Sequence, residues 1–325
     1  MNKQFQYELW RECNNNCTWC YLGSEKFKTE DSLKIRNINH FIENVDRLMF
    51  NEEFNNVSLI GGEFFQGQMK NLEVKELFMK AIDKIIEYLS HNEKRSTWIT
   101  VTLTTEKQPD LYEMLEKLSQ SNNKNIWLCT SYDTIGRFHT EQNKLNWENH
   151  MRNISKQFPM LKKNTCMILT QDLMEKYIND EMDFKLFKES FGTQLFLKPP
   201  DRGSLKNKEE MMNKIPNFFP KRETTLEFLV KLMNEDFELT HGLMNVNLRA
   251  DVTINNYNDG SRYDSQRNKN KINEYDNDSH EYELKEEFNL TLESNTCGHS
   301  TYYQCYEDSD DCILCDIIRL KTSMM

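Results

Sequence analysis

The sequence predicts an α/β fold, in which a parallel sheet is covered by helices. Six short apolar stretches lie within the first two hundred residues, and longer stretches with apolar residues three and four positions apart lie between them. Strands and helices that alternate in this way form parallel sheets, because a parallel connection must cross over the sheet. Six such repeats fit either an open doubly wound sheet or an incomplete barrel, and periodicity does not distinguish these two forms.

The predicted elements follow from local patterns. The predicted strands span residues 5–10, 57–60, 98–103, 126–131, 165–169 and 194–197. Helices are predicted over residues 38–49, 77–89 and 111–118, and Pro109 is suited to the first turn of the third helix. After residue 197 the alternation ends, and one more helix is predicted over residues 226–233.

Composition and charge exclude several classes of protein. The chain of 325 residues carries 41 Lys and Arg against 52 Asp and Glu, a net charge of −11, so binding to bulk nucleic acid is not expected. No apolar run approaches the roughly 20 residues that span a bilayer. The first residues also lack the apolar stretch of a signal peptide. We therefore expect a cytoplasmic protein without membrane contact.

Seven of the nine cysteines form two clusters. Three lie near the start of the chain and four near its end, and in a reducing compartment such clusters favour metal sites over disulfides. Cys129 and Cys166 stand alone within apolar runs, which predicts that both pack in the core as small hydrophobic residues.

The first cluster has the spacing C-x3-C-x2-C and directly follows the first predicted strand, with thiols at Cys13, Cys17 and Cys20. Three thiolates on one loop suit three corners of an iron–sulfur cube and leave the fourth iron open to a ligand. The alternative is half of a structural zinc site, in which a histidine completes three cysteines.

This spacing and position resemble the radical S-adenosylmethionine (radical SAM) family. The resemblance implies a partial (β/α)6 barrel of the TIM type over residues 1–205. It also implies a [4Fe-4S] cluster held by Cys13, Cys17 and Cys20, with S-adenosyl-L-methionine at the open iron and an electron donor such as flavodoxin or ferredoxin. One electron then cleaves S-adenosylmethionine to a 5′-deoxyadenosyl radical.

A second motif strengthens the resemblance. Gly61, Gly62 and Glu63 end the second predicted strand, where the family has a turn whose backbone approaches the methionine moiety and whose Glu meets its ammonium group. Phe64 follows, where the family frequently has proline. The resemblance also implies that Trp19 lies near the adenine.

Weaker matches to the family lie on the third and fourth strands. The end of the fourth strand resembles the family's polar strand end, so Ser131 and Asp133 are expected to contact the ribose or the methionine carboxylate. An ordinary strand-end cap is the alternative for both residues. Thr102 and Thr104 are further candidates for lining the pocket.

The second cluster comprises Cys297, Cys305, Cys312 and Cys315. Four thiols suit either a tetrahedral zinc or a second [4Fe-4S] cluster. The segment resembles the SPASM and twitch extensions of radical SAM enzymes, which implies a small cysteine-rich metal-binding domain over residues 246–325, joined by a helical connector at 206–245. A β-hairpin is expected at residues 250–260. An exposed polar stretch is expected at about 259–287, as either a long hairpin or a mobile loop.

The predicted function is therefore that of a radical SAM enzyme, and the tail resembles those of enzymes that modify peptides or proteins. A nucleotide or small-metabolite substrate is the alternative. A hypothesis of another class is a non-enzymatic binding protein that zinc stabilises at both clusters. Iron and sulfide content distinguishes the enzyme from this binding protein.

Overall fold

The computed structural model describes residues 3–10, 12–15, 17, 29–52, 54–198, 218, 220–236, 239, 252–256, 261–263 and 271–274. Six parallel strands alternate with helices, as predicted. The strands are β1 (Lys3–Glu8), β2 (Phe54–Ile60), β3 (Ser96–Thr100), β4 (Ile126–Tyr132), β5 (Lys162–Ile168) and β6 (Gln194–Lys198). The helices between them are α1 (Asp31–Leu48), α2 (Leu72–Ser90), α3 (Pro109–Ser119), α4 (Glu141–Gln157), α5 (Gln171–Ile178) and α6 (Phe184–Phe191).

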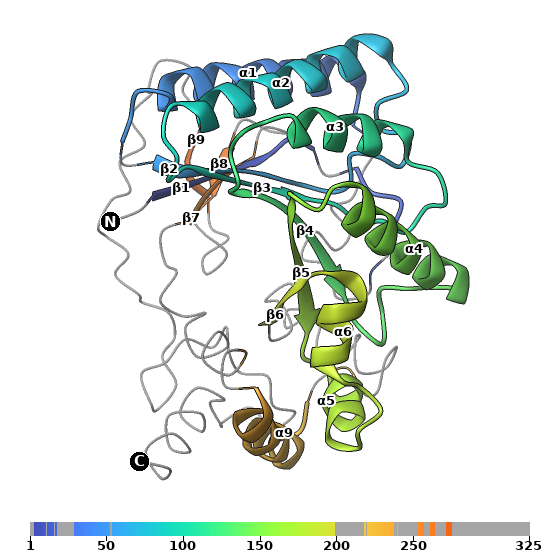
Figure 1. Ribbon diagram of the computed structural model, residues 1–325. Helices are drawn as coiled ribbons and strands as arrows, with labels where there is room; N and C mark the ends of the chain where they lie inside the picture. Colours follow the sequence, from blue (N-terminus) through green and yellow to red (C-terminus); the bar gives the residue numbers. More distant parts are fainter. Residues whose placement is uncertain are drawn as a thin grey trace.

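The order of the strands makes this sheet a partial barrel. From β6 to β1 the neighbours follow one another in sequence, and every pair among these six strands is parallel. Crossovers between parallel strands have one hand, so an order that never reverses keeps all the helices on one face. Figure 1 shows α1 to α6 along the outer side of a curved sheet. The prediction of a partial (β/α)6 barrel is confirmed, since a doubly wound sheet would reverse its order.

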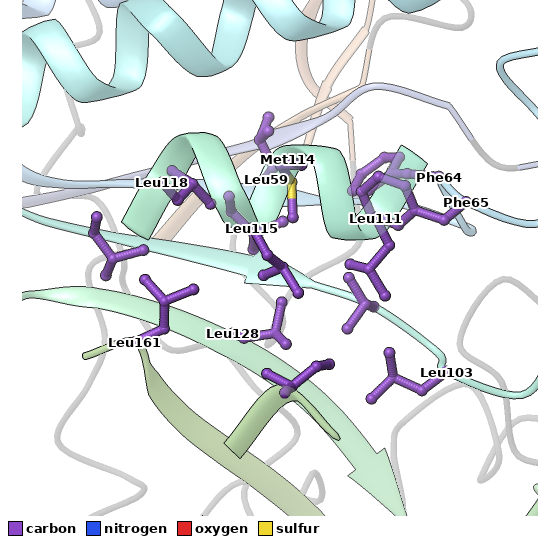
Figure 2. Close-up of a cluster of buried hydrophobic side chains, with 14 of the residues drawn as sticks. Leu59, Phe64, Phe65, Leu103, Leu111, Met114, Leu115, Leu118, Leu128 and Leu161 are labelled. Carbon is purple, nitrogen blue, oxygen red and sulfur yellow. The ribbon is translucent and has the colours of Figure 1, made fainter. Parts of the chain in front are cut away.

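The hydrophobic core fills the layer between the sheet and the helices. In Figure 2 the inner face of α3 packs toward Leu59 of β2 and Leu128 of β4. The residues that α3 buries there recur at the helical period and are Leu111, Met114, Leu115 and Leu118. Pro109 opens this helix at its first position, as the sequence predicts.

The opposite, concave face of the sheet is more polar. On β4, Ile126, Leu128 and Thr130 are buried toward the helices, whereas Trp127, Cys129 and Ser131 alternate with them and keep partial exposure. The indole of Trp147 in α4 donates to Thr130 Oγ1 at 3.0 Å, which fixes the helix side of the strand. Ser131 therefore faces the interior of the partial barrel.

The prediction that Cys129 and Cys166 are core residues is wrong. Both residues keep partial exposure, and Cys166 pairs in register with Ser131 on the concave face. In an apolar run, the sequence does not reveal which of the alternating residues face the helices. Here both cysteines lie on the opposite, concave face of the sheet. Enough neighbouring atoms enclose Cys129 that burial, together with the nearby Cys166, raises its pKa to about 12.

Beyond β6, the described residues add one helix and three strands. Helix α9 (Arg222–Glu235) packs on α5, with Phe228 against the ring of Tyr177, while Val230 of the predicted apolar set is 41% exposed. Strand β7 (Val252–Asn256) pairs in parallel with β1, and β8 (Ser261–Tyr263) returns antiparallel to it. This pair confirms the predicted hairpin.

Part of the range predicted as a long hairpin or a mobile loop forms antiparallel strands, which agrees with the hairpin. Within residues 259–287, β8 pairs antiparallel with β9 (Lys271–Glu274). The exposure of this range and the division into segments 1–205, 206–245 and 246–325 stay predictions. No helix among the described residues has both the length and the apolar character needed to cross a membrane.

Replacement of Leu115 by alanine tests the packing of α3. Leu115 is fully buried, so Leu115→Ala should lower the free energy of unfolding by about 2–5 kcal/mol, because it leaves a cavity in the core. Leu186→Ala is the matched control, since that side chain is 59% exposed and its loss should change stability by less than about 0.5 kcal/mol. Urea denaturation measures both, and equal effects would contradict the placement of α3.

Candidate functional site

The residues predicted to bind a cofactor gather at the carboxyl ends of β1, β2 and β4. Parallel strands end at one edge of the sheet, and the loops that follow them meet there. Cys13 and Cys17 follow β1, Gly61 to Glu63 follow β2, and Asp133 follows β4. The fold therefore brings together motifs that are separated by about fifty and seventy residues in the sequence.

The loop that carries Cys13 and Cys17 (the cysteine loop) is hydrogen-bonded at its start to the turn formed by Gly61, Gly62 and Glu63 (the glycine turn). The main-chain N–H of Gly62 donates to the carbonyl of Trp10 at 2.9 Å, and that of Glu63 donates to the carbonyl of Glu12 at 2.8 Å. The indole N–H of Trp10 donates back to the carbonyl of Glu63 at 2.7 Å. The residue before Cys13 is thus held directly against the Gly-Gly-Glu turn.

Gly61 is required by this close approach. Its φ is +150°, and a Cβ atom built there would lie 2.5 Å from the carbonyl oxygen of Trp10. A side chain would therefore push the end of β1 away from the turn. The backbone of β2 approaches β1 so closely only because this residue is glycine.

The carboxylate of Glu63 bonds to backbone groups on two loops. Oε1 accepts from the N–H groups of Phe64 and Phe65, both at 2.8 Å, and Oε2 accepts from the N–H of Thr102 at 2.8 Å. The side chain is almost completely buried. Burial raises the pKa of Glu63, and the hydrogen bonds from Thr102, Phe65 and Phe64 oppose that shift without cancelling it. Glu63 thereby connects the turn after β2 to the end of β3.

Phe64, the residue after this turn, contributes both its ring and its main-chain N–H to the site. Its ring is buried edge-on against Trp10, with ring centres 5.2 Å apart, and its N–H is one of the donors to Glu63. Proline lacks that N–H. A proline at this position would therefore remove one of the hydrogen bonds that hold the carboxylate of Glu63.

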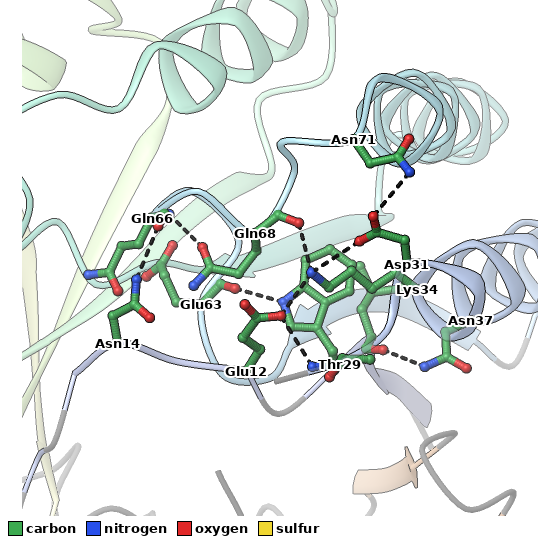
Figure 3. A network of polar contacts seen from close by, with 12 residues as sticks. Glu12, Asn14, Thr29, Asp31, Lys34, Asn37, Glu63, Gln66, Gln68 and Asn71 are labelled. Atoms are coloured by element: carbon green, nitrogen blue, oxygen red, sulfur yellow. Dashed lines mark hydrogen bonds and ion pairs between the residues drawn. The ribbon is translucent and has the colours of Figure 1, made fainter. Parts of the chain in front are cut away.

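Side-chain amides bind the two loops to the end of β3. Gln66 donates to Thr104 Oγ1 at 2.8 Å and to Thr102 Oγ1 at 3.1 Å, and the hydroxyl of Thr104 donates to Asn15 Oδ1 at 2.8 Å. In Figure 3, Asn14 also contacts the main chain of Gln66, at 3.1 Å. Both threonines are buried. They support the loops through these contacts.

At the end of β4, Asp133 caps its own turn. It is buried, and Oδ1 accepts the N–H of Arg137 at 3.1 Å. The guanidinium of Arg137 donates to the carbonyl of Thr102 at 3.1 Å, which connects this turn to β3. The alternative of a strand-end cap is thus present in the structure for Asp133. Contacts of Ser131 and Asp133 with a cofactor stay predictions.

Sequence reasoning missed two buried cations at this edge of the sheet. Arg137 is 4% exposed and Lys34 is 3% exposed. The pattern offers no signal for Arg137. For Lys34 a signal exists, because it lies four residues before Ile38 and hence on the buried stripe of α1.

Two of the predicted metal ligands, Cys13 and Cys17, are among the described residues, and their thiols suit a soft metal. Cys13 and Cys17 keep partial exposure, and thiolates are ligands for iron–sulfur clusters and for zinc. Within the described part of the chain, no three or more His, Cys, Asp or Glu side chains gather closely enough to hold a metal ion. The remaining predicted site residues lie outside the described residues and are Trp19, Cys20, Cys297, Cys305, Cys312 and Cys315.

Comparison with known proteins finds similar solved structures, but no similar family model and no similar curated protein. The chain is similar to SuiB of Streptococcus suis bound to S-adenosylmethionine, at 12% sequence identity and a TM-score of 0.45. The match covers 81% of this chain and 58% of the other, so this chain spans less than two thirds of the length of SuiB.

Gly61→Ala tests the close approach of β1 and β2. The new Cβ would displace the carbonyl of Trp10, so the variant should lose about 1–3 kcal/mol more stability than Gly67→Ala. Gly67 is the matched control, because its φ is also positive, at +92°, but a Cβ there meets only the flexible end of Lys70. Urea denaturation of both variants measures the difference, and equal losses would contradict the contact.

Glu63→Gln tests the effect of burial on this carboxyl group. A raised pKa means that folded protein retains a proton that unfolded protein has lost, so wild-type stability should fall as pH rises above the usual Glu pKa of about 4.3. Glutamine does not titrate. Unfolding free energies of both proteins, measured between about pH 4 and pH 7, should give a wild-type minus variant difference that declines with pH. A difference that grows with pH would show that the hydrogen bonds outweigh burial.

Proposed function

We propose that this protein is a radical SAM enzyme, in which Cys13, Cys17 and Cys20 hold a [4Fe-4S] cluster and the Gly-Gly-Glu turn positions S-adenosylmethionine. When bound and reduced, such a cluster supplies the electron that cleaves S-adenosylmethionine to methionine and a 5′-deoxyadenosyl radical, which abstracts hydrogen from the substrate. The proposal extends to a peptide or protein as the substrate class.

One observation carries the proposal more than any other. The residue before Cys13 is hydrogen-bonded to Glu63, so the cysteine loop and the glycine turn occupy the same edge of the sheet. A structural zinc loop has no need of such a turn. A cofactor bound at an open iron does need accessible main-chain groups beside the cluster. Gly61 and Gly62 have no side chains that would cover their own main-chain groups.

The residues of this chain have distinct proposed parts in binding S-adenosylmethionine. Gly61 and Gly62 leave backbone groups accessible to the amino acid moiety. Glu63 holds the turn rigid through three N–H groups, and its negative charge at that place favours an ammonium group nearby. Ser131 faces the barrel interior at the end of β4 and is suited to donate to the carboxylate or ribose. Trp19 is proposed beside the adenine.

The substrate class and the second metal site rest on the cysteine-rich tail. The spacing of Cys297, Cys305, Cys312 and Cys315 resembles the SPASM and twitch extensions, which supports a peptide or protein substrate and an auxiliary [4Fe-4S] cluster. Zinc at this site and a nucleotide or small metabolite as substrate are the competing outcomes. A reduced flavodoxin or ferredoxin is the proposed electron donor.

Anaerobic reconstitution tests the proposed function directly. Iron and sulfide are counted, dithionite and S-adenosylmethionine are added, and 5′-deoxyadenosine is quantified by chromatography. We expect 5′-deoxyadenosine and about eight irons per chain, which corresponds to two cubane clusters. About four irons with the same product would support the radical SAM assignment and would indicate that the four C-terminal cysteines bind zinc instead of a second cluster.

The control is the variant with Cys13, Cys17 and Cys20 changed to alanine together. It should form no 5′-deoxyadenosine and should keep the metal of the tail, because its four cysteines are intact. Cleavage of S-adenosylmethionine by this variant would contradict the assignment. Colourless wild-type protein that contains zinc alone would favour the zinc-stabilised binding protein.

A further inference from the structure

A buried lysine lies beneath both loops of the candidate site. Lys34 belongs to the first turns of α1, and it precedes Ile38 and Phe41 by four and seven positions on the buried face of that helix. Only 3% of its surface is exposed. Lysine is almost never buried to this extent unless it is paired, so its partners indicate what it does.

The ammonium group of Lys34 contacts both loops at once. Nζ lies 2.8 Å from Oε2 of Glu12, the residue before Cys13, and donates to the carbonyl of Gln68 at 2.8 Å, on the loop after the glycine turn. It also lies 3.7 Å from Asp31 Oδ1 and 5.6 Å from the centre of the Trp10 ring. Figure 3 shows these groups converging on Lys34 from three segments of the chain.

Glu12 also contacts the segment that follows the cysteines. Its Oε2 accepts the N–H of Thr29 at 3.3 Å, and its main-chain carbonyl accepts the N–H of Glu63 at 2.8 Å. Thr29 follows the three cysteines in the sequence, whereas Glu12 precedes them. Both sides of the cysteine loop are therefore attached to one ion pair.

We propose that the Lys34–Glu12 ion pair positions the thiols of Cys13 and Cys17 relative to the Gly-Gly-Glu turn. Lys34 is buried and the side chain of Glu12 is 17% exposed, so removing either member leaves the other charge poorly compensated, and the loop should lose its attachment. What the positioned thiols bind rests on the proposed function. The positioning itself is a property of the polypeptide and is testable without a cluster.

Thiol reactivity of the full-length chain before reconstitution measures the positioning. The protein is treated with iodoacetamide, and the rate at which each cysteine is alkylated is measured by peptide mass spectrometry. In Lys34→Met, Cys13 and Cys17 should react about tenfold faster than in wild type, because local opening of the loop becomes easier. Cys129 and Cys166 are internal references on the concave face, and their rates should stay within about twofold. Lys34→Arg should restore slow reaction, since it keeps the charge and the donors.

Lys75→Met is the matched control for the loss of a paired lysine. Lys75 of α2 lies 2.8 Å from Asp110 and 2.7 Å from Glu113, in a more exposed position away from the cysteine loop. Its loss should leave the rates of Cys13 and Cys17 unchanged. The proposal is overturned if Lys34→Met leaves those rates as in wild type, or if it raises all four thiol rates equally.

Glu12→Gln keeps the proposal testable if Lys34→Met does not accumulate. Glutamine retains the size of Glu12 and an oxygen for the N–H of Thr29 but loses the charge, so Cys13 and Cys17 should again react faster. The double variant should react no faster than the faster single variant, because both changes remove one interaction. Unchanged thiol rates in Glu12→Gln would overturn the proposal.

Affinity for S-adenosylmethionine tests the consequence for the proposed enzyme. In reconstituted Lys34→Met, the dissociation constant, measured from the perturbed spectrum of the reduced cluster, should rise about tenfold, equivalent to about 1.4 kcal/mol, at unchanged iron content. An unchanged constant would contradict the inference. Wild-type protein that binds no iron would defeat the proposed function, while the alkylation rates would still decide whether the ion pair holds the loop.

Discussion

The candidate site depends on hydrogen bonding between β1 and β2 that continues past the ends of both strands. Within the sheet, Glu8 pairs with Ile60, and the N–H of Leu9 reaches the carbonyl of Ile60 at 3.3 Å. Gly62 and Glu63 then donate to Trp10 and Glu12, so the two loops leave the sheet side by side. The place of Cys13 follows from this pairing, because Cys13 is the next residue of the chain.

Similar contacts occur after β3, where buried side chains from the turns after β2 and β4 bond to the main chain of Thr102. Glu63 connects the turn after β2 to the N–H of Thr102, and Arg137 connects the turn after β4 to the carbonyl of Thr102. On the helix side, Lys34 connects α1 to both loops. Charged groups so deeply buried are stable only when partners satisfy them, so each contact constrains the geometry of the edge.

The sequence patterns locate the six strands to within a few residues and identify the helices α1, α2, α3 and α9. They give no range for α6, although that helix buries Phe184, Phe187 and Phe191. Strand β5 begins with Lys162 and Lys163, and so its start was not recognised. Helix α4 buries Asn146 and His150, which bond to the carbonyls of Thr104 and Thr105 at 3.0 Å and 2.7 Å. Its buried face is partly polar because it binds a loop, and hydrophobic periodicity does not detect such a face. The apolar runs around Cys129 and Cys166 predicted burial in the core but not the side of the sheet that each thiol faces.

Local sequence patterns are enough to specify the alternation of strands and helices, the spacing of the three cysteines and the glycines that permit a close turn. These depend on residues near one another in the chain, where period and spacing carry the information. Long-range packing, by contrast, specifies that the strands follow one another without reversal and that the cysteine loop meets the glycine turn. It also specifies that Lys34, Glu12, Arg137 and Gln66 support the site. The long-range contacts of these side chains join residues that are between 17 and 51 positions apart in the chain. Contacts over such distances are set by the packing of the whole sheet, which no local pattern records.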